Sequence, residues 1–215
     1  MKYKHLYTVR ENLAIHYIGE TPNYMELIDL SYINIYGVPE EWDNARREAA
    51  REDHEKAVKI GNIFGCMVHG EEISRQNKDT YELCDDLFSV LKPIVLSLAD
   101  NNGPLSKEHG GDTKNHYYIN EIELNDSSVM PIILDNLTDI IYTHHCTHTD
   151  IISCAIKSLP NENTVHNRID RTQKSIDQLI NYPSEYINHE AWQPFLDAGF
   201  KEWEESRVLY KEIQG

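Results

Sequence analysis

The sequence has few cysteines, and none of them belongs to a metal-binding or redox pair. The four residues, Cys66, Cys84, Cys146 and Cys154, form no Cys-x-x-Cys motif. Zinc ribbons and thioredoxin-like sites need that close spacing. The sequence therefore excludes both classes of site, and it predicts reduced thiols in a cytosolic chain.

Long apolar runs are also missing. No segment approaches the ~20 consecutive apolar residues that a membrane-spanning helix needs, and the mean hydropathy is -0.57. The first residues, Met1 to His5, are polar and aromatic and lack the apolar stretch of a secretory signal. We therefore expect a cytoplasmic protein that inserts into no membrane.

Glycine-rich nucleotide-binding motifs and internal repeats are absent. The 10 glycines form neither a G-x-G-x-x-G pattern nor a P-loop, so the common α/β nucleotide-binding enzymes are excluded. At about 150 residues per domain, the length predicts one or two domains. We expect a single compact domain over 1–215, with the polar loop near 100–115 as its one candidate boundary.

The chain has far fewer basic residues than acidic ones. The chain has 36 Asp and Glu residues against 20 Lys and Arg residues, which gives a net charge of -16 spread along the sequence. Such a field repels phosphate backbones and anionic lipid, so we expect no direct binding to nucleic acid. A basic protein, including one that itself handles nucleic acid, is the partner that this charge favours. The same charge would also keep a protein soluble without any partner.

Apolar periodicity predicts a predominantly helical α+β fold. The clearest helix, over 79–98, opens with a capping box and continues with apolar residues at helical spacing. A second helix is expected to run unbroken over 130–159. Alternating residues predict a hairpin of two short strands over 3–18, with its turn at 10–12, and a strand over 116–124. The expected architecture is a bundle of about five helices with a small antiparallel sheet from the N-terminal and central segments.

The segment 143–150 holds the densest group of metal-ligating side chains. On an unbroken helix, His144 and His148 lie one turn apart and face the core. Two imidazoles placed in this way can ligate one Zn, Fe or Mn ion. Further ligands are left open among His54, Glu55, His69, Glu72, His109 and Asp112. Two alternatives are left open: a buried histidine pair that hydrogen bonds to tyrosine hydroxyls or backbone carbonyls, and a helix break at Thr147 or Thr149 that places the group in a loop.

Carboxylates form a second candidate metal site. Glu52 and Glu55 form an E-x-x-E pair, and Glu82 and Asp85 form an E-x-x-D pair, so two neighbouring helices could hold Mg²⁺ between them. This pattern resembles the all-α nucleotide pyrophosphohydrolases of the MazG type, most closely over 82–91. The resemblance implies a Mg²⁺-dependent hydrolase of nucleoside triphosphates. In a chain this acidic, such pairs also arise by chance on solvated helix faces.

The C-terminal segment combines large rings with carboxylates, as protein-binding surfaces do. The candidate protein-binding residues are Trp192, Phe195, Phe200, Trp203, Glu204 and Glu205. The alternative is that the rings dock the last helix onto the core.

Charge, this terminal segment and the lack of a complete catalytic motif favour an acidic binding protein. We expect an inhibitor or modulator of a basic or nucleic-acid-handling protein, such as a phage accessory protein. A metal-dependent hydrolase is the alternative, so enzymatic activity is left open, as is the oligomeric state. No cofactor is expected other than a divalent metal.

Overall fold

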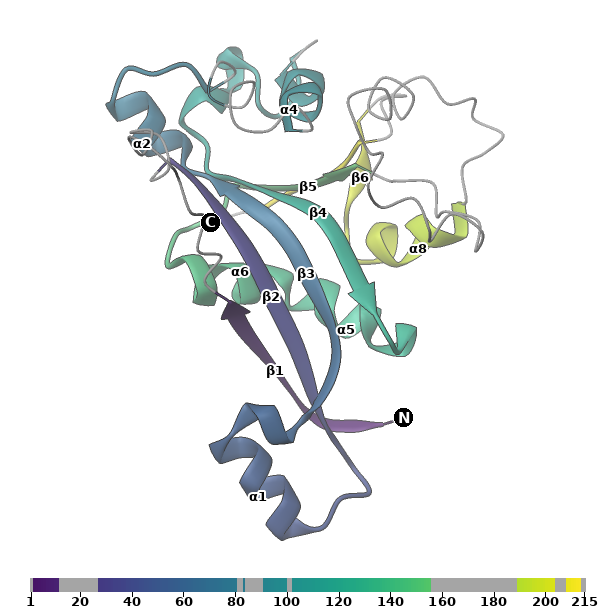
Figure 1. Ribbon diagram of the computed structural model, residues 1–215. Helices are drawn as coiled ribbons and strands as arrows, with labels where there is room; N and C mark the ends of the chain where they lie inside the picture. Colours follow the sequence, from purple (N-terminus) through teal and green to yellow (C-terminus); the bar gives the residue numbers. More distant parts are fainter. Residues whose placement is uncertain are drawn as a thin grey trace, which may run out of the picture.

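The structure is a computed structural model, and it describes residues 2–11, 27–80, 83, 91–99, 102–155, 189–203 and 208–213. Its centre is a mixed sheet of seven strands (Figure 1). The strands are β1 (Tyr3–Glu11), β2 (Ile28–Pro39), β3 (Val58–Val68), β4 (His116–Leu124), β5 (Ile151–Ala155), β6 (Lys201–Glu202) and β7 (Val208–Glu212). They lie in the order β1-β2-β3-β4-β5-β7-β6. Neighbours are antiparallel except β4 and β5, which are parallel.

The long strands of the sheet have two faces of different character. In β2, Ile33 and Ile35 are fully buried, whereas Tyr32 and Tyr36, which point to the opposite face, are half-buried. This alternation follows from the two-residue period of a strand. Ile33 is opposite Ile63 of β3, so the buried row continues across the sheet. The main core lies on this isoleucine face.

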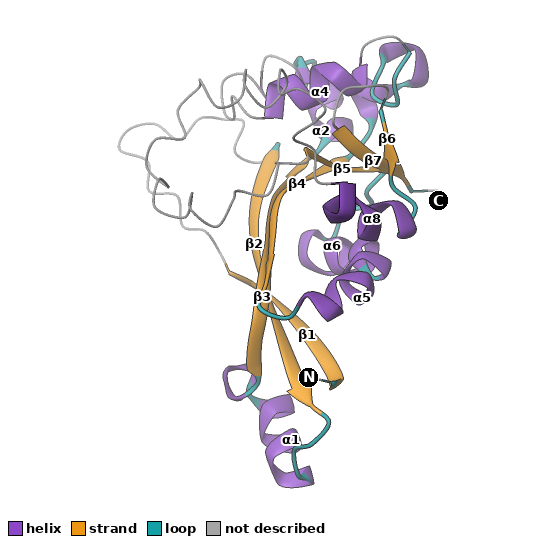
Figure 2. Ribbon diagram, turned by 90° about the vertical axis from the view of Figure 1, so that its right-hand side faces the viewer, coloured by secondary structure: helices purple, strands orange, loops and turns teal. Residues whose placement is uncertain are grey.

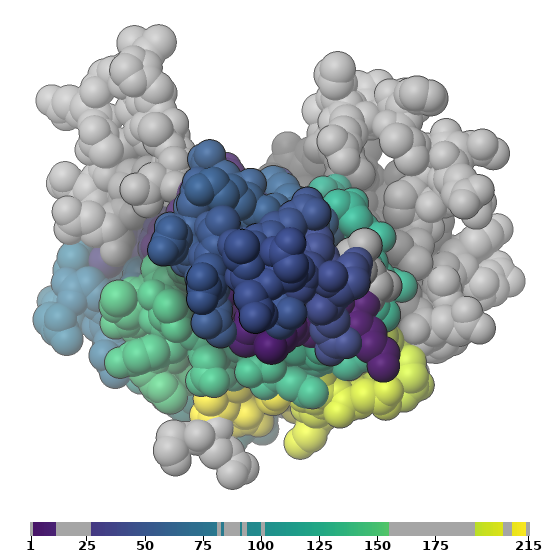
Figure 3. Space-filling view, turned by 90° about the horizontal axis from the view of Figure 1, so that it is seen from below, coloured from purple at the N-terminus to yellow at the C-terminus, as the bar shows by residue number. Residues whose placement is uncertain are grey.

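Helices cover parts of both faces of the sheet (Figure 2). They are α1 (Asn44–Glu52), α2 (Gly70–Arg75), α4 (Leu91–Ala99), α5 (Met130–Asp135), α6 (Leu137–His145) and α8 (His189–Asp197), with short 3-10 turns η1 (His54–Lys56), η2 (Lys107–His109), η3 (Gly111–Thr113) and η4 (Ser127–Val129). Helices α5, α6 and α8 pack on the isoleucine face. On the other face, α4 packs near the start of β2. At the far end of β2, Ala50 of α1 and Trp42, which precedes that helix, pack against Val38, and Figure 3 looks onto that end.

The predicted bundle of about five helices with a small sheet is wrong, and so is the description of the protein as helical. A seven-stranded sheet organises the described part of the chain, and the helices are laid against it. Of the predicted strands, the one over 116–124 is confirmed as β4. The first strand of the expected N-terminal hairpin is β1, but it continues through Arg10 and Glu11, where the turn was expected. Residues 12–18 lie outside the described residues.

The unbroken helix predicted over 130–159 is also wrong. Helix α6 ends at His145, and Cys146 follows it in the left-handed conformation with φ 52°. The chain then enters β5 at Ile151. A strand buried on both faces is apolar throughout, and its pattern cannot be told from that of a buried helix by periodicity alone. Here the parallel pairing with β4 makes residues 151–155 a strand and not the end of a helix.

The polar loop near 100–115 is packed where the structure describes it. Leu105 is buried in the same apolar cluster as Leu98 of α4, and Lys114 donates from Nζ to the carbonyl oxygen of Pro104 at 2.8 Å. The prediction of a single domain stays a prediction. In the part of the chain that the structure describes, no helix has the length and apolar character needed to cross a membrane.

Candidate functional site

A row of polar side chains crosses the face of the sheet opposite α5 and α6. It consists of Glu11 of β1, Asn34 of β2, Asn62 of β3 and Glu123 of β4, and we call it the carboxylate–amide row. Asn34 is opposite Asn62, and Asn62 is opposite Glu123. Because side chains alternate along a strand, the row points away from the buried Ile33 and its neighbours.

Hydrogen bonds hold the row in a fixed arrangement. Asn34 donates from Nδ2 to Glu11 Oε1, and Asn62 donates from Nδ2 to Glu123 Oε2 at 3.3 Å. Both amides are buried, with exposed fractions of 1% and 8%, whereas the two carboxylates lie at the exposed ends. The Oδ1 atom of Asn34 accepts no hydrogen bond within the described part of the chain. A buried acceptor without a hydrogen-bond donor costs about 1–3 kcal/mol of folding free energy. The Oδ1 atom of Asn34 carries this cost.

Aromatic rings flank the carboxylate–amide row. Tyr32 and Phe64 lie in the neighbouring pair of positions, with ring centroids 6.5 Å apart. Glu121 is opposite Phe64 on the same face. The chain's own Lys59 places Nζ 5.8 Å from the centroid of the Tyr32 ring. Carboxylates beside ring faces form an environment that attracts cations.

A second polar cluster lies under the end of α6. The side chain of His145 is fully buried and donates from Nδ1 to Asp29 Oδ2 at 2.9 Å. Arg10 pairs with the other oxygen of Asp29 and donates to the carbonyl oxygen of His144 at 2.8 Å. Partial burial raises the pKa of Asp29, but the hydrogen bonds from His145 and Arg10 outweigh it and leave the pKa below its ordinary value.

The role of this second polar cluster is structural. His145 packs edge-on against the ring of Tyr117, with centroids 5.4 Å apart, and its side chain is closed to solvent. No substrate can reach the imidazole in this conformation. Arg10 satisfies a backbone carbonyl at the C-terminal end of α6, where cations are favoured. The cluster therefore ties α6 to β1 and β2.

The two histidines predicted to share a metal lie in different settings. His144 is half-buried in the last turn of α6, with Nε2 2.9 Å from Thr8 Oγ1. His148 lies in the following loop and is exposed, with Nε2 3.6 Å from Asp150 Oδ1. The predicted spacing of one helical turn is wrong, because the helix ends between the two residues. The described residues contain no group of three or more His, Cys, Asp or Glu that could hold a metal, and metal binding stays a prediction.

The predicted carboxylate site is split by a turn where the structure shows it. Glu52 is the last residue of α1 and Glu55 belongs to η1, so the two side chains do not share a helix face. Both are exposed. Glu82 and Asp85 lie outside the described residues, and the Mg²⁺ site stays a prediction.

Two of the C-terminal aromatic residues are buried, and the other two are partly exposed. Trp192 and Phe200 are both buried in the core, and Phe195 packs edge-on against Phe200 with centroids 5.4 Å apart. Trp203 packs against the ring of Tyr210 at 5.9 Å. Glu204 and Glu205 lie outside the described residues. A partner can reach neither Trp192 nor Phe200 in this conformation, so the protein-binding role predicted for the segment gains no support from these two rings.

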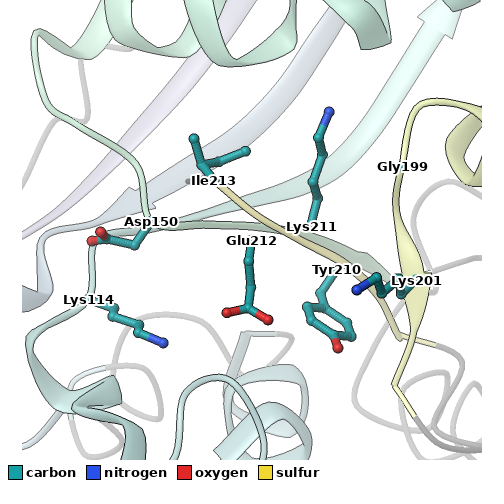
Figure 4. Close-up of a pocket in the computed structure, with 8 residues that line it drawn as sticks. All are labelled: Lys114, Asp150, Gly199, Lys201, Tyr210, Lys211, Glu212 and Ile213. Atoms are coloured by element: carbon teal, nitrogen blue, oxygen red, sulfur yellow. The ribbon is translucent and has the colours of Figure 1, made fainter. Parts of the chain in front are cut away.

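A cavity of about 330 Å³ lies at the end of β7 (Figure 4). It is lined by Lys114, Asp150, Gly199, Lys201, Tyr210, Lys211, Glu212 and Ile213. Tyr210 and Glu212 point to one side of the strand, and Lys211 and Ile213 point to the other. Burial, and then the charge of Glu212, raise the pKa of Tyr210. Three lysines and two carboxylates line the same cavity, so charges of both signs face it.

Sequence reasoning missed the carboxylate–amide row, although the sequence carried a signal for it. Asparagine is depleted in strands, yet Asn34 and Asn62 each precede a buried isoleucine in the middle of a β-branched segment. An amide inside such a segment needs a hydrogen-bonding partner on its own face of the sheet. The register that supplies the partners is tertiary and could not be read from the sequence.

Comparison of the chain with protein-family models, with curated proteins and with solved structures finds no match.

Proposed function

We propose that this chain is an acidic binding protein that docks on a basic surface of another protein and acts as its inhibitor or modulator. The observation that carries the proposal is the net charge of -16. A field of this sign accelerates encounter with basic surfaces and suppresses encounter with nucleic acid and anionic lipid. The basic partner is therefore a protein.

Two features of the described surface support the proposal. Exposed carboxylates occur on both sides of the sheet, for example Glu123 on β4 and Asp139 on α6. At the carboxylate–amide row, hydrogen bonds from Asn34 and Asn62 already orient the acidic side chains. Pre-oriented groups lose less conformational entropy on binding than free side chains do.

The test uses a fluorescein-labelled peptide of alternating arginine and glycine, with fluorescence anisotropy as the readout. We expect binding at about 50 mM salt that weakens at least about tenfold by about 300 mM, because salt screens exposed charges. A peptide with glutamate in place of arginine, and a labelled DNA duplex, serve as controls and should not bind. Failure of the arginine peptide to bind at low salt would overturn the proposal.

A further inference from the structure

We propose that the basic partner docks on the outer side of helices α5 and α6, and that it presents a helix with two basic residues between two apolar ones. This inference rests on the proposed function and gives it a place on the molecule. The docking residues are Ile132, Asp135, Asp139 and Tyr142, and we call them the α5–α6 strip. All four side chains are exposed to solvent.

The α5–α6 strip forms one line of side chains because the two helices are almost continuous (Figure 1). Asn136 donates its backbone N–H to the carbonyl oxygen of Ile132 at 3.2 Å, and Ile140 donates to that of Asn136 at 3.0 Å. Helical hydrogen bonding therefore passes from α5 into α6. Spacings of three and four residues keep side chains on the same side of a helix. Residues 132 and 142 are then about 15 Å apart along the helix axis.

The two ends of the strip are apolar and open to solvent. The described part of the chain exposes four large apolar side chains, which are Leu96, Ile132, Tyr142 and Leu196. Ile132 and Tyr142 have exposed fractions of 50% and 59%, and Leu196 lies on α8, which contacts α5. Three of the four thus lie on the helices of one layer. Apolar side chains that gather in one region of a surface, unlike scattered ones, mark interaction surfaces.

The charge of this region identifies the partner. Residues 115–156 contain no lysine or arginine, and α8 contains none either. Asp135 and Asp139 are one helical turn apart, and neither forms an ion pair with any described residue. Two like charges at this spacing destabilise a helix, and a basic group of a partner would relieve their repulsion. The strip therefore fits a partner that is basic in the middle and apolar at both ends.

A helix of the partner matches the strip in length and in pattern. Positions i, i+3, i+7 and i+10 lie on one side of a helix and span about 15 Å. Apolar, basic, basic and apolar residues at these positions can each face a residue of the strip. A second copy of this chain fits badly, because it would bring the same carboxylates against Asp135 and Asp139.

The first experiment tests the chemistry of the partner. The probe is a fluorescein-labelled helical peptide with leucine, arginine, arginine and leucine at positions i, i+3, i+7 and i+10 of an alanine–glutamine background. The control peptide has the same composition, but its leucines lie on the opposite side of the helix. We expect anisotropy titrations to give the control peptide a Kd at least about fivefold higher, because it loses the apolar contacts. Equal Kd values would overturn the inference.

The second experiment tests the carboxylates of the strip with two matched double variants. Asp135→Asn with Asp139→Asn removes both of them. Glu48→Gln with Glu52→Gln removes two exposed carboxylates of the same spacing from α1. We expect the strip variant to raise the Kd of the helical peptide at least about tenfold and the α1 variant to raise it about twofold or less. Circular dichroism checks that both variants are folded.

The third experiment tests the apolar ends and the position of the peptide. Ile132→Gln should raise the Kd at least about fivefold, whereas Leu96→Gln, which alters an exposed leucine of α4 on the other face of the sheet, should raise it about twofold or less. A nitroxide label on the bound peptide should broaden the backbone amide NMR signals of residues 130–145 more than those of residues 44–52. Equal broadening, or equal effects of the two substitutions, would overturn the docking surface.

The possible results separate this inference from the proposed function. If the arginine–glycine peptide binds at low salt but the strip and α1 variants lose equal affinity, attraction by overall charge explains the binding. That result overturns the docking surface and leaves the proposed function standing. Failure of both peptides to bind the parent protein would overturn both. Sedimentation velocity should show the parent as a single species of 25.0 kDa. A dimer that Ile132→Gln abolishes would assign the strip to a second copy and overturn the inference.

Discussion

His145 shows how one buried imidazole can depend on a single carboxylate. Its side chain is fully buried, and Asp29 accepts its Nδ1 proton at 2.9 Å. Asp29→Ala therefore leaves a buried donor and the guanidinium of Arg10 without their shared acceptor. We expect a loss of about 1–3 kcal/mol of unfolding free energy, measured by urea denaturation. Asp139→Ala is the exposed control, and a loss below about 0.5 kcal/mol for Asp29→Ala would contradict the structural role.

His116 gives the protein a stability that depends on pH. Burial lowers the pKa of His116 to about 4, and its Nε2 lies 2.6 Å from Ser153 Oγ. In the unfolded chain the pKa is near the ordinary value of 6.5. Between these values the unfolded chain binds the proton and the folded protein does not, so the unfolding free energy falls as pH falls from about 6.5 to about 4.

Replacing His116 tests this pH dependence. His116→Gln should flatten the fall in unfolding free energy between pH about 6.5 and about 4, whatever it does to stability at neutral pH. His109→Gln, a substitution at an exposed histidine, is the control variant. Urea titrations at several pH values give the measurement. Identical slopes in the parent and in His116→Gln would show that other groups cause the acid sensitivity.

At the scale of elements, the end of α6 depends on an unusual backbone conformation. Cys146 follows the helix with φ 52°, a region that costs non-glycine residues about 1–2 kcal/mol. We expect Cys146→Gly to be neutral or stabilising in thermal unfolding, because glycine is the usual residue at this position. Cys146→Val should lower the unfolding free energy by about 1–2 kcal/mol, since β-branched residues tolerate positive φ least. A Cys146→Val variant as stable as the parent protein would contradict this expectation, because it would mean that residue 146 can leave the left-handed conformation.

The same segment shows what the sequence could and could not predict. The alternation in 116–124 predicts β4 correctly, although the first four residues of that strand are all buried. The apolar residues Ile151 and Ile152 fit a helix and a buried strand equally well. Only pairing with β4 distinguishes the two. The predicted histidine pair depended on the wrong alternative, and the carboxylate–amide row depends on a strand register that no local pattern encodes.

At the scale of the whole molecule, the binding proposal predicts a dependence on bulk pH. The sequence pI is about 5.0, so the net negative charge vanishes as pH falls from neutral to that value. Affinity for the arginine peptide should therefore fall steadily between pH about 7 and about 5, as attraction is lost. Anisotropy titrations at constant ionic strength give the measurement. An affinity that does not change over this range would argue against electrostatic recognition.

The position of β7 between β5 and β6 has a consequence for synthesis on the ribosome. β6 precedes β7 in the chain, yet within the described sheet its only partner is β7. Until residues 208–212 leave the exit tunnel, β6 has no strand to join, and the apolar β5 presents a bare edge. Bare apolar edges invite aggregation. The strands therefore cannot be added to the sheet in chain order as the chain emerges. We expect chaperones to capture nascent chains that are arrested before residue 208.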